Sequence, residues 1–451
     1  MSIDDDEDDP HALRVAEASR ALKQAPAAPL ALVKGTSNLF RDRHHAPRTR
    51  LDLHAFHHVL GASAENGWVD VEGMATYDEL VDWCLPRGVM PAVVPQLKTI
   101  TAGGAVAGVG IEATSFRHGL VHHTMRELEV LLPGGDVVTC TPHNEHRDLF
   151  HGFANSYGCL GYALRVRLAT VPVRAYVHVR HHHFAAAAPF FSALSRACAE
   201  HHDFVDGVAF GPDEFVLSTA VFTDQAPWCS DYTFKQIYWR SLRERDEDYL
   251  TVAGYLWRWD TDWFWCSRQF GAQHPLIRRM LGRERLNSRT YSRWMRWNAR
   301  WHLSQKLARL RGLYRESVIQ DVDIPLSRAP EFLSFLQREI GIRPVWVCPV
   351  RGDTPAGRFP LYPLGDAALY VNFGFWDVLQ TRQPHEPAHF NRLVEQEVLG
   401  LGGIKSLYSE SFFTPEEFWE MFGLEAYESL KERYDPLERA PQLYDKCVTG
   451  A

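Results

Sequence analysis

The stretch Thr101-Ala102-Gly103-Gly104-Ala105-Val106-Ala107-Gly108-Val109-Gly110-Ile111-Glu112 decides the fold class of this 451-residue chain. Its glycines remove side chains where the backbone must approach something bulky, planar or charged, and their N–H groups can bind a diphosphate. The spacing is neither a G-x-G-x-x-G turn opening a long helix nor a P-loop, since no Gly-Lys-Ser/Thr follows. A glycine-rich turn that is packed tightly for structural reasons remains the alternative for this segment alone.

Two further loops of small residues flank this segment. Upstream, Val33-Lys34-Gly35-Thr36-Ser37-Asn38-Leu39-Phe40 follows a predicted strand, where its amides and hydroxyls could bind a second phosphate. Downstream, Asn155-Ser156-Tyr157-Gly158-Cys159-Leu160-Gly161-Tyr162 precedes another predicted strand. Three such loops in one domain indicate a site for a large ligand.

Composition and charge exclude several classes of protein. The formal net charge of -8 argues against a nucleic-acid-binding protein, whose surface must neutralise phosphates. The eight cysteines are scattered without a C-x-x-C pair, so reduced thiols are expected. The acidic start of the chain lacks the features of a signal peptide, and no stretch reaches a membrane-spanning length. We therefore expect an acidic N-terminal tail over residues 1–29, whose first ten residues are solvated or, as the alternative, form an electrostatic interaction arm. We also expect a cytoplasmic protein, with peripheral contact at the inner membrane face as an option.

The rest of the chain divides into two regions by pattern. Short β-rich runs broken by glycine and proline predict an α+β domain up to about residue 174, with a helix at 76–85 whose Thr76 and Glu79 have the capping-box spacing. An alternating strand at 175–180 opens the second region. Near the end, residues 415–434 have the periodicity of one amphipathic helix.

The run Pro95 to Gly104, with Gly110-Ile111-Glu112 and Phe116 to Leu120, resembles the FAD-binding domain of vanillyl-alcohol-oxidase (PCMH) flavoproteins, and within them the Δ24-sterol reductase (Diminuto/seladin) family. Supporting motifs follow in order: Cys140-Thr141-Pro142, Asp148-Leu149-Phe150, Val318 to Asp321, Pro344 to Pro349, Glu417 to Phe422, and Tyr444-Asp445-Lys446 before Val448. The resemblance implies an α+β fold in which a two-subdomain PCMH-type FAD-binding domain (30–174) is followed by an inserted α/β substrate-binding cap (175–404), and 405–451 returns to the FAD-binding domain.

The resemblance also implies which residues contact FAD. The expected cofactor-binding residues are Lys34, Gly35, Thr36, Ser37, Asn38, Leu39, Thr101, Ala102, Gly103, Gly104, Gly108, Gly110, Ile111, Glu112, Ala113, Thr114, Ser115, Gly158 and Gly161. Covalent members of the superfamily attach flavin through a histidine of the first phosphate loop. That loop contains none here, so we predict non-covalent FAD, although His44 and His45 lie just beyond it. NADPH or a related donor is the expected reductant.

Three residues are candidates for the proton transfer that must accompany flavin chemistry. By resemblance the strand 317–325 passes the flavin, and alternation puts Ile319, Asp321 and Asp323 on one face. Asp321 in an apolar cap could have a raised pKa and donate a proton, or could merely accept hydrogen bonds. At the return from the cap, Tyr408 could donate a proton with Glu410 setting its hydrogen bonding, or could be an ordinary buried tyrosine. Lys405 is a weaker candidate for balancing the charge of reduced flavin.

Histidines and tryptophans cluster in the second region. His178 and His181 to His183 share one predicted strand, which cannot wrap a tetrahedral ion, so no metal is expected. Nine of the fourteen tryptophans lie between Trp228 and Trp301, interleaved with thirteen arginines. This pattern fits peripheral contact with membrane headgroups, or a tryptophan-rich core with a basic rim.

We therefore predict an enzyme, an FAD-dependent oxidoreductase acting on CH–CH groups, which reduces an isolated C=C bond in a lipid. A methylene group on a fatty acyl chain is the preferred substrate for a bacterial source, with a lipid methyltransferase as functional partner, and a sterol side chain is the other option. Two alternatives stay open: an FAD-dependent alcohol or sugar-lipid dehydrogenase or oxidase, and a non-enzymatic flavin-containing protein that interacts with lipids.

Overall fold

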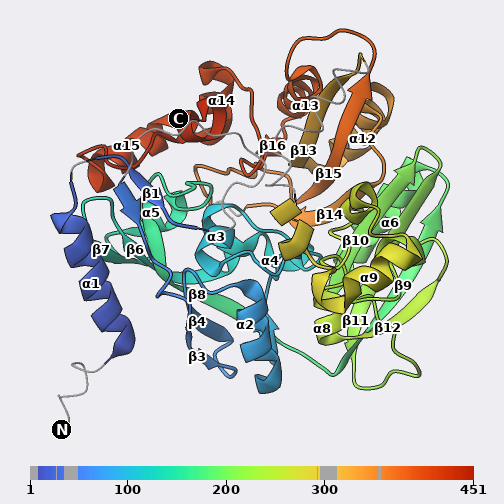
Figure 1. Ribbon diagram of the computed structural model, residues 1–451, viewed down its shortest axis with the longest axis horizontal. Helices are drawn as coiled ribbons and strands as arrows, with labels where there is room; N and C mark the ends of the chain where they lie inside the picture. The colour runs from blue at the N-terminus through green and yellow to red at the C-terminus, as the bar shows by residue number, and fades with distance from the viewer. Residues whose placement is uncertain are drawn as a thin grey trace.

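Two large β-sheets, each with its own helices, lie side by side in the protein (Figure 1). The computed structural model describes residues 9–26, 28–34, 49–291, 293–294, 312–353 and 357–450. The predicted α+β class is confirmed, because antiparallel sheets and helices both make up the fold.

The first sheet has the order β3-β4-β8-β6-β7, and β5 also pairs with β8. Its strands are β3 (Val59–Ser63), β4 (Trp68–Glu72), β5 (Val89–Pro91), β6 (Met125–Leu131), β7 (Val137–Cys140) and β8 (Tyr162–Pro172). A separate parallel pair is formed by β1 (Leu30–Leu32) and β2 (Thr49–Leu51). Helices α2 (Tyr77–Cys84), α3 (Ala102–Ala107), α4 (Ser115–His118) and α5 (Arg147–Gly152) connect these strands. The predicted capping box opens α2, where the Thr76 amide donates to the Glu79 carboxylate at 2.8 Å.

The second sheet has the order β12-β9-β11-β10-β14-β15-β13-β16. Its strands are β9 (Tyr176–Phe184), β10 (Phe204–Gly211), β11 (Glu214–Thr223), β12 (Glu247–Thr251), β13 (Tyr314–Pro325), β14 (Val345–Arg351), β15 (Leu369–Thr381) and β16 (Ile404–Lys405). The sheets thus change over between Pro172 and Tyr176. Lys405 still pairs with Val322, so this sheet extends one residue past the predicted limit at 404.

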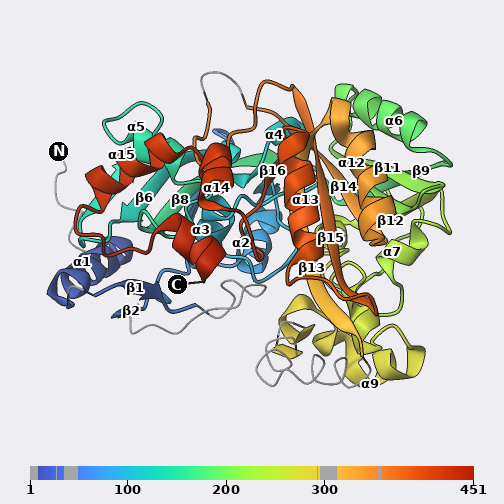
Figure 2. The ribbon, with the colours of Figure 1, turned by 90° about the horizontal axis from the view of Figure 1, so that it is seen from above.

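Helices cover one face of the second sheet, as seen from above in Figure 2. Phe373 of β15 packs against Phe191 of α6 (Ala187–Ala199) and Phe332 of α12 (Ala329–Phe335). Helix α13 (His389–Gly400) lies on the same face, where its Asn391 accepts a hydrogen bond from Gln320 of β13. Because neighbours alternate along a strand, Asp321 and Asp323 point to the opposite face.

The remaining helices lie around the second sheet and at the C-terminus. They are α7 (Tyr238–Ser241), α8 (Val252–Leu256), α9 (Pro275–Arg285), α14 (Pro415–Phe422) and α15 (Leu424–Tyr434), with a π-helical turn at Asp445–Thr449. The single amphipathic helix predicted over 415–434 is wrong in one respect. Gly423 has φ 62°, a left-handed conformation that ends α14 and starts α15.

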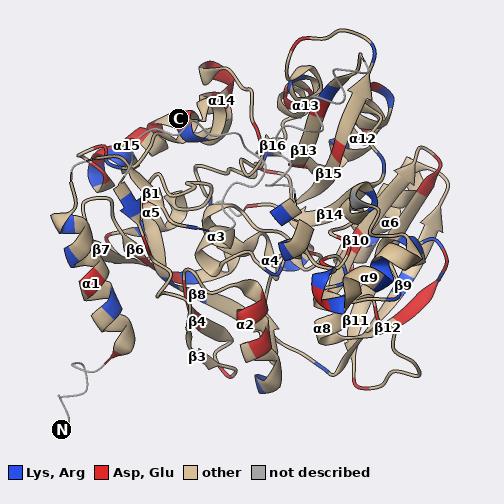
Figure 3. Ribbon diagram, viewed as in Figure 1, with Lys and Arg blue, Asp and Glu red and all other residues tan. Residues whose placement is uncertain are grey.

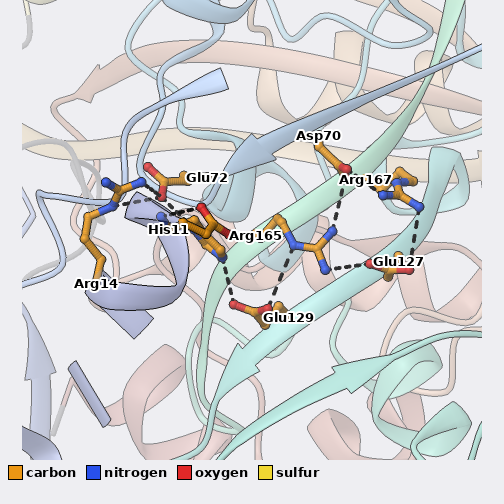
Figure 4. A network of polar contacts seen from close by, with 9 residues as sticks. His11, Arg14, Asp70, Glu72, Glu127, Glu129, Arg165 and Arg167 are labelled. Carbon is orange, nitrogen blue, oxygen red and sulfur yellow. Dashed lines mark hydrogen bonds and ion pairs between the residues drawn. The ribbon is translucent and has the colours of Figure 1, made fainter. Parts of the chain in front are cut away.

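The N-terminal segment is not a tail over its whole predicted length. Residues 10–24 form α1 (Pro10–Gln24), which packs on the first sheet through buried His11 and Leu22. The side chain of Glu72, fully buried, accepts hydrogen bonds from Arg14 at 2.6 Å and contacts His11 at 2.7 Å. Figure 4 shows this network, which continues through Glu129 to a second group of ion pairs: Asp70, Glu127, Arg165 and Arg167.

The hydrogen bonds of this network determine the protonation states of His11 and Glu72. Burial alone would lower the pKa of His11, but hydrogen bonds to Glu129 and Glu72 outweigh it and raise the pKa to about 9. Burial would raise the pKa of Glu72, but its bonds to His11, His58 and Arg14 lower it to about 2. The predicted tail over 1–29 is therefore too long, because His11 and Arg14 pair with Glu72, about sixty residues away in the sequence.

Four of the seven described tryptophans of the predicted cluster form a core, whereas Trp228 is exposed. Trp257, Trp259, Trp263 and Trp265 are all buried. Their indoles therefore cannot insert into a headgroup layer, and for them the tryptophan-rich core is the correct alternative. Trp297 and Trp301 lie outside the described residues.

Candidate functional site

A cavity of about 320 Å³ lies where the two halves of the protein meet, a size within the range of small-molecule sites. The first region lines it with Lys34, Thr101, Gly103, Gly104, Gly108, Gly110, Ile111, Tyr157, Gly158 and Gly161, among others. The second region contributes Trp263, Phe264, Asp321, Trp346 and Trp376, and the C-terminal segment contributes Ser406, Tyr408 and Lys446. The predicted glycine-rich segment thus forms one wall, and two predicted catalytic residues form part of another.

The glycine-rich wall is shaped by the absence of side chains. Thr101 caps α3, and its hydroxyl oxygen accepts from the Gly104 amide at 3.2 Å. A Cβ on Gly104 would lie 2.6 Å from the Lys34 ammonium, and one on Gly108 would lie 2.9 Å from the Gly104 carbonyl oxygen. A Cβ on Gly110 would meet Pro95 at 2.9 Å. Gly104 therefore leaves room for the lysine at the cavity wall, whereas Gly110 permits close packing.

Two lysines bring positive charge to the glycine-rich end. Lys34 donates to the Thr101 hydroxyl at 2.7 Å, and Lys446, from the C-terminal π-helical turn, donates to the Tyr157 carbonyl. Burial, together with repulsion from Lys446, lowers the pKa of Lys34 to about 8. Two neighbouring cations beside exposed backbone favour an anion between them, and a diphosphate has the matching charge.

Lys446 was not among the predicted cofactor-binding residues. Its sequence separation from the glycine-rich segment exceeds three hundred residues, so no local spacing could have connected them. The signal that could have found it is its position in the motif Tyr444-Asp445-Lys446, which resembles the sterol reductase family.

The opposite end of the cavity is aromatic. The ring centroids of Phe264 and Trp376 are 4.3 Å apart, and those of Phe264 and Trp346 are 5.7 Å apart. Trp263 and Phe264 have φ values of 43° and 59°, a left-handed conformation that side-chain-bearing residues rarely adopt. Such strain persists where the surroundings enforce it, and it is concentrated at ligand sites.

Asp321 is the acidic group of this aromatic end. The Tyr408 hydroxyl donates to its carboxylate, and Trp376 Nε1 donates to the Tyr408 oxygen at 2.9 Å. The second carboxyl oxygen, Oδ1, is buried and has no hydrogen-bond partner among the described residues. Burial, opposed by the Tyr408 hydrogen bond and assisted by the charge of Asp323, raises the pKa of Asp321 to about 7. A buried carboxyl group with this pKa can hold a proton at neutral pH.

Asp323 shares the face of Asp321 but not its environment. Tyr362 donates to one oxygen of Asp323 at 2.6 Å, and Asn372 donates to the other at 2.9 Å. Burial raises the pKa of Asp323 to about 6. Both its oxygens have partners and it does not line the cavity, so its role is structural.

Several predicted cofactor-binding residues do not line the cavity: Ala102, Glu112, Ala113, Thr114 and Ser115. Glu112 is buried and forms an ion pair with Arg258 at 2.7 Å, while Arg258 also binds Asp206 at 2.9 Å. The carboxylate of Glu112 is therefore used to hold the two halves of the protein together. Gly35, Thr36, Ser37, Asn38 and Leu39 lie outside the described residues.

Glu410 and Lys405 are likewise placed away from the cavity. Lys405 is fully buried, pairs with Glu395 at 2.9 Å and donates to the Glu410 carbonyl at 2.5 Å. Its charge is used within this cluster, which argues against the predicted role of balancing flavin charge.

The residues present fit an FAD molecule. The lysines and glycines at one end suit a diphosphate, and the aromatic wall at the other suits a planar ring system. The unpartnered oxygen of Asp321 marks the point where a bound group would complete the hydrogen bonding.

Comparison with known proteins agrees with this geometry. The family described as FAD binding domain matches residues 12–141. Delta(24)-sterol reductase of Homo sapiens is 28% identical over 428 residues, which cover 87% of this chain and 76% of the relative. The Mus musculus reductase is 29% identical over 398 residues (82% and 71%), and that of Arabidopsis thaliana 22% over 457 residues (91% and 78%). The predicted resemblance is confirmed, and the chain is an FAD-dependent oxidoreductase.

The predicted cytoplasmic location is wrong by the same comparison. The sterol reductases that resemble this chain are membrane-associated enzymes of the endoplasmic reticulum. Within the described residues, no helix combines the length and the apolar character needed to cross a bilayer.

Proposed function

We propose that this FAD-dependent oxidoreductase reduces an isolated C=C bond in a lipid and takes its electrons from NADPH. One observation carries the proposal: a buried carboxyl group with one open oxygen, Asp321, lies in the aromatic wall of a cavity whose other end suits a diphosphate. The names of the similar reductases point to the same reaction class. In this proposal the first sheet is part of a two-subdomain FAD-binding domain, and the second sheet is an inserted cap.

Saturating an alkene requires a hydride on one carbon and a proton on its neighbour. Reduced FAD, when bound, supplies the hydride, and NADPH restores the reduced form. Asp321 supplies the proton and is protonated again from solvent. Asp321 is better suited than Tyr408, because burial and the nearby charge of Asp321 raise the pKa of Tyr408 well above its ordinary value. Tyr408 is therefore a positioning residue that orients the Asp321 carboxyl group.

The aromatic wall supports an apolar substrate. Trp263, Phe264, Trp346 and Trp376 offer few hydrogen bonds to a sugar or a small alcohol, but a large surface to a hydrocarbon. Within this class we favour a fatty acyl chain that carries a methylene group. A lipid methyltransferase would supply such a chain, because methyl transfer to a double bond can leave a methylene branch.

The test is anaerobic reduction and reoxidation of the flavin in the purified holoenzyme. We expect NADPH to bleach the flavin absorbance and a methylene-bearing phospholipid in detergent to restore it, with a methyl-branched product seen by mass spectrometry. Reduction of the flavin by an alcohol would contradict the proposal and favour a dehydrogenase. A flavin that no pyridine nucleotide reduces would instead favour a non-enzymatic role. Reoxidation by a sterol alkene but not by the phospholipid would reject the preferred substrate alone.

A further inference from the structure

Helix α9 carries three of its four large apolar side chains on the outside of the protein, while the fourth, Leu281, packs against the core. Among the described residues, nine large apolar side chains are exposed, and three of them belong to this one helix: Leu276, Ile277 and Met280. Leu276 is 68% exposed and Met280 is 82% exposed. Leu276 and Met280 are one turn apart, so they form a continuous apolar ridge. Figure 2 places α9 at the edge of the molecule.

The only buried residue described on α9 is an arginine, which explains why the apolar side chains face outward. Arg278 binds both oxygens of Asp262, at 2.7 and 2.9 Å. It also donates to the Phe234 and Gln236 carbonyls. This bidentate, buried pair fixes the rotation of the helix about its axis. Turning Leu276 and Met280 inward would leave Asp262 buried without its partner, so the outward ridge is built into the fold.

Exposed arginines accompany the apolar ridge. Arg279 is exposed on the same helical stretch as the ridge, and Arg283 and Arg285 are exposed just beyond Gly282, whose φ of 70° interrupts the helix. Glu284 is the single exposed acidic residue of α9. Arg279 and Arg285 form no ion pair with any described residue, whereas Arg283 pairs with Asp231. The blue segments of α9 in Figure 3 show this basic character.

We propose that α9 docks the protein on an anionic phospholipid surface. Leu276 and Met280 insert among the headgroups, and Arg279 and Arg285 contact lipid phosphates. A second copy of the chain fits this surface less well, because a two-fold contact would bring the same arginines face to face. The contact is peripheral, and it does not depend on the buried tryptophans of the core.

Docking through α9 also brings the membrane close to the substrate cavity. Asp262, which anchors α9, directly precedes Trp263 and Phe264 in the cavity wall. The Trp263 ring further stacks on Tyr291. The segment that holds the docking helix therefore also shapes the aromatic end of the cavity.

The test is flotation of the flavin-loaded full chain with vesicles of phosphatidylcholine, alone or with about 30 mol % phosphatidylglycerol. We expect flotation with the anionic vesicles at low salt and its loss at high salt. The double variant Leu276→Ser/Met280→Ser should bind at least about tenfold more weakly. Arg279→Gln and Arg285→Gln should each weaken binding about fivefold.

Two matched control variants distinguish binding through α9 from non-specific adsorption to the vesicles. Leu437→Ser removes an apolar side chain that is 71% exposed outside the cap, and Arg196→Gln removes an exposed arginine of α6. Both should float like the unchanged protein, and all variants should keep their flavin absorbance. Failure of the unchanged protein to float, or undiminished flotation of the Leu276→Ser/Met280→Ser variant, overturns the proposal. Flotation involves no turnover, so this result is independent of the proposed reaction.

Discussion

Replacing Asp321 with asparagine removes the proposed proton donor while keeping the shape of the side chain. The unchanged protein should lose activity as pH rises, because the protonated carboxyl group is the active form. With a pKa of about 7, the group is about 90% protonated at pH 6 and about 10% at pH 8. The rate of flavin reoxidation by the alkene should therefore fall about tenfold over this interval. Asp321→Asn should be slower by about a hundredfold or more and should lose this pH dependence.

The same substitution should make the folded protein more stable at alkaline pH. The pKa of Asp321 is raised in the folded state, so the folded protein binds more protons than the unfolded chain between about pH 4 and pH 7, and stability declines as pH rises through this window. A shift from 3.8 to about 7 corresponds to about 4 kcal/mol at pH 8. Asp321→Asn has no such titration, so its unfolding free energy should decline less between pH 5 and pH 8.

The assay is stopped-flow reoxidation of pre-reduced enzyme, which isolates the step that needs the proton from the reduction by NADPH. Asp377→Asn is the matched control, because Asp377 lies on the neighbouring strand β15 but outside the lining of the cavity. Full activity of Asp321→Asn, with the pH dependence retained, would refute the role of Asp321. Tyr408→Phe distinguishes the two candidate donors. It removes a hydrogen bond that lowers the pKa of Asp321, so the loss of activity should move to higher pH, whereas complete inactivity at every pH would point to Tyr408 as the donor.

Three further predictions concern FAD binding and the ion pairs that stabilise the fold. Lys34→Met should weaken FAD binding at least about tenfold, measured by fluorescence titration of the apoprotein, because a buried charge-assisted contact to the diphosphate is lost; unchanged affinity would place the diphosphate elsewhere. Arg258→Met removes the cationic partner of two buried carboxylates, Glu112 and Asp206, and should cost about 3–5 kcal/mol in urea unfolding. Arg268→Met should cost at most about 1 kcal/mol, because its exposed ion pair is 3.7 Å long. The pKa of His11 is raised from 6.5 to about 9, so the stabilisation by its protonated form is complete below pH 6.5 and is lost as pH rises through 9. The unfolding free energies of the wild-type protein and of His11→Gln should therefore differ by about 3 kcal/mol less at pH 10 than at pH 6. A difference that does not change with pH would contradict the ion pairs of α1.

Local patterns in the sequence predicted the features that depend on local chemistry. The capping residues Thr76 and Glu79 correctly predicted the start of α2, because a capping box depends only on residues three positions apart. Alternation along 317–325 correctly put Asp321 and Asp323 on one face, because a strand has a fixed period of two. The glycines from 103 to 110 indicated a close approach of backbone to something large, and they do line the cavity.

Features that depend on distant partners were missed. Glu112 belongs to the glycine-rich run, but Arg258, 146 residues further along the chain, determines its role. The N-terminal tail was predicted to extend to residue 29, whereas α1 packs on the first sheet and its His11 pairs with Glu72 of β4. Composition also could not separate buried tryptophans from interfacial ones, because both lie beside arginines in the sequence. The membrane contact we infer instead rests on Leu276 and Met280, which composition did not single out.

Asp321 and Asp323 differ in a way that explains why we propose Asp321, and not Asp323, as the proton donor. Both are carried by one strand, face the same way and have raised pKa values. Tyr362 and Asn372 satisfy Asp323, which can therefore be explained by stability alone. Asp321 keeps a buried oxygen without a partner, and this costs free energy that a valine or leucine at the same place would not. An acidic residue that destabilises the fold is expected in a ligand cavity when the reaction needs its proton. If Asp321→Asn raises the unfolding free energy and abolishes the reaction, this would be the clearest evidence for that role.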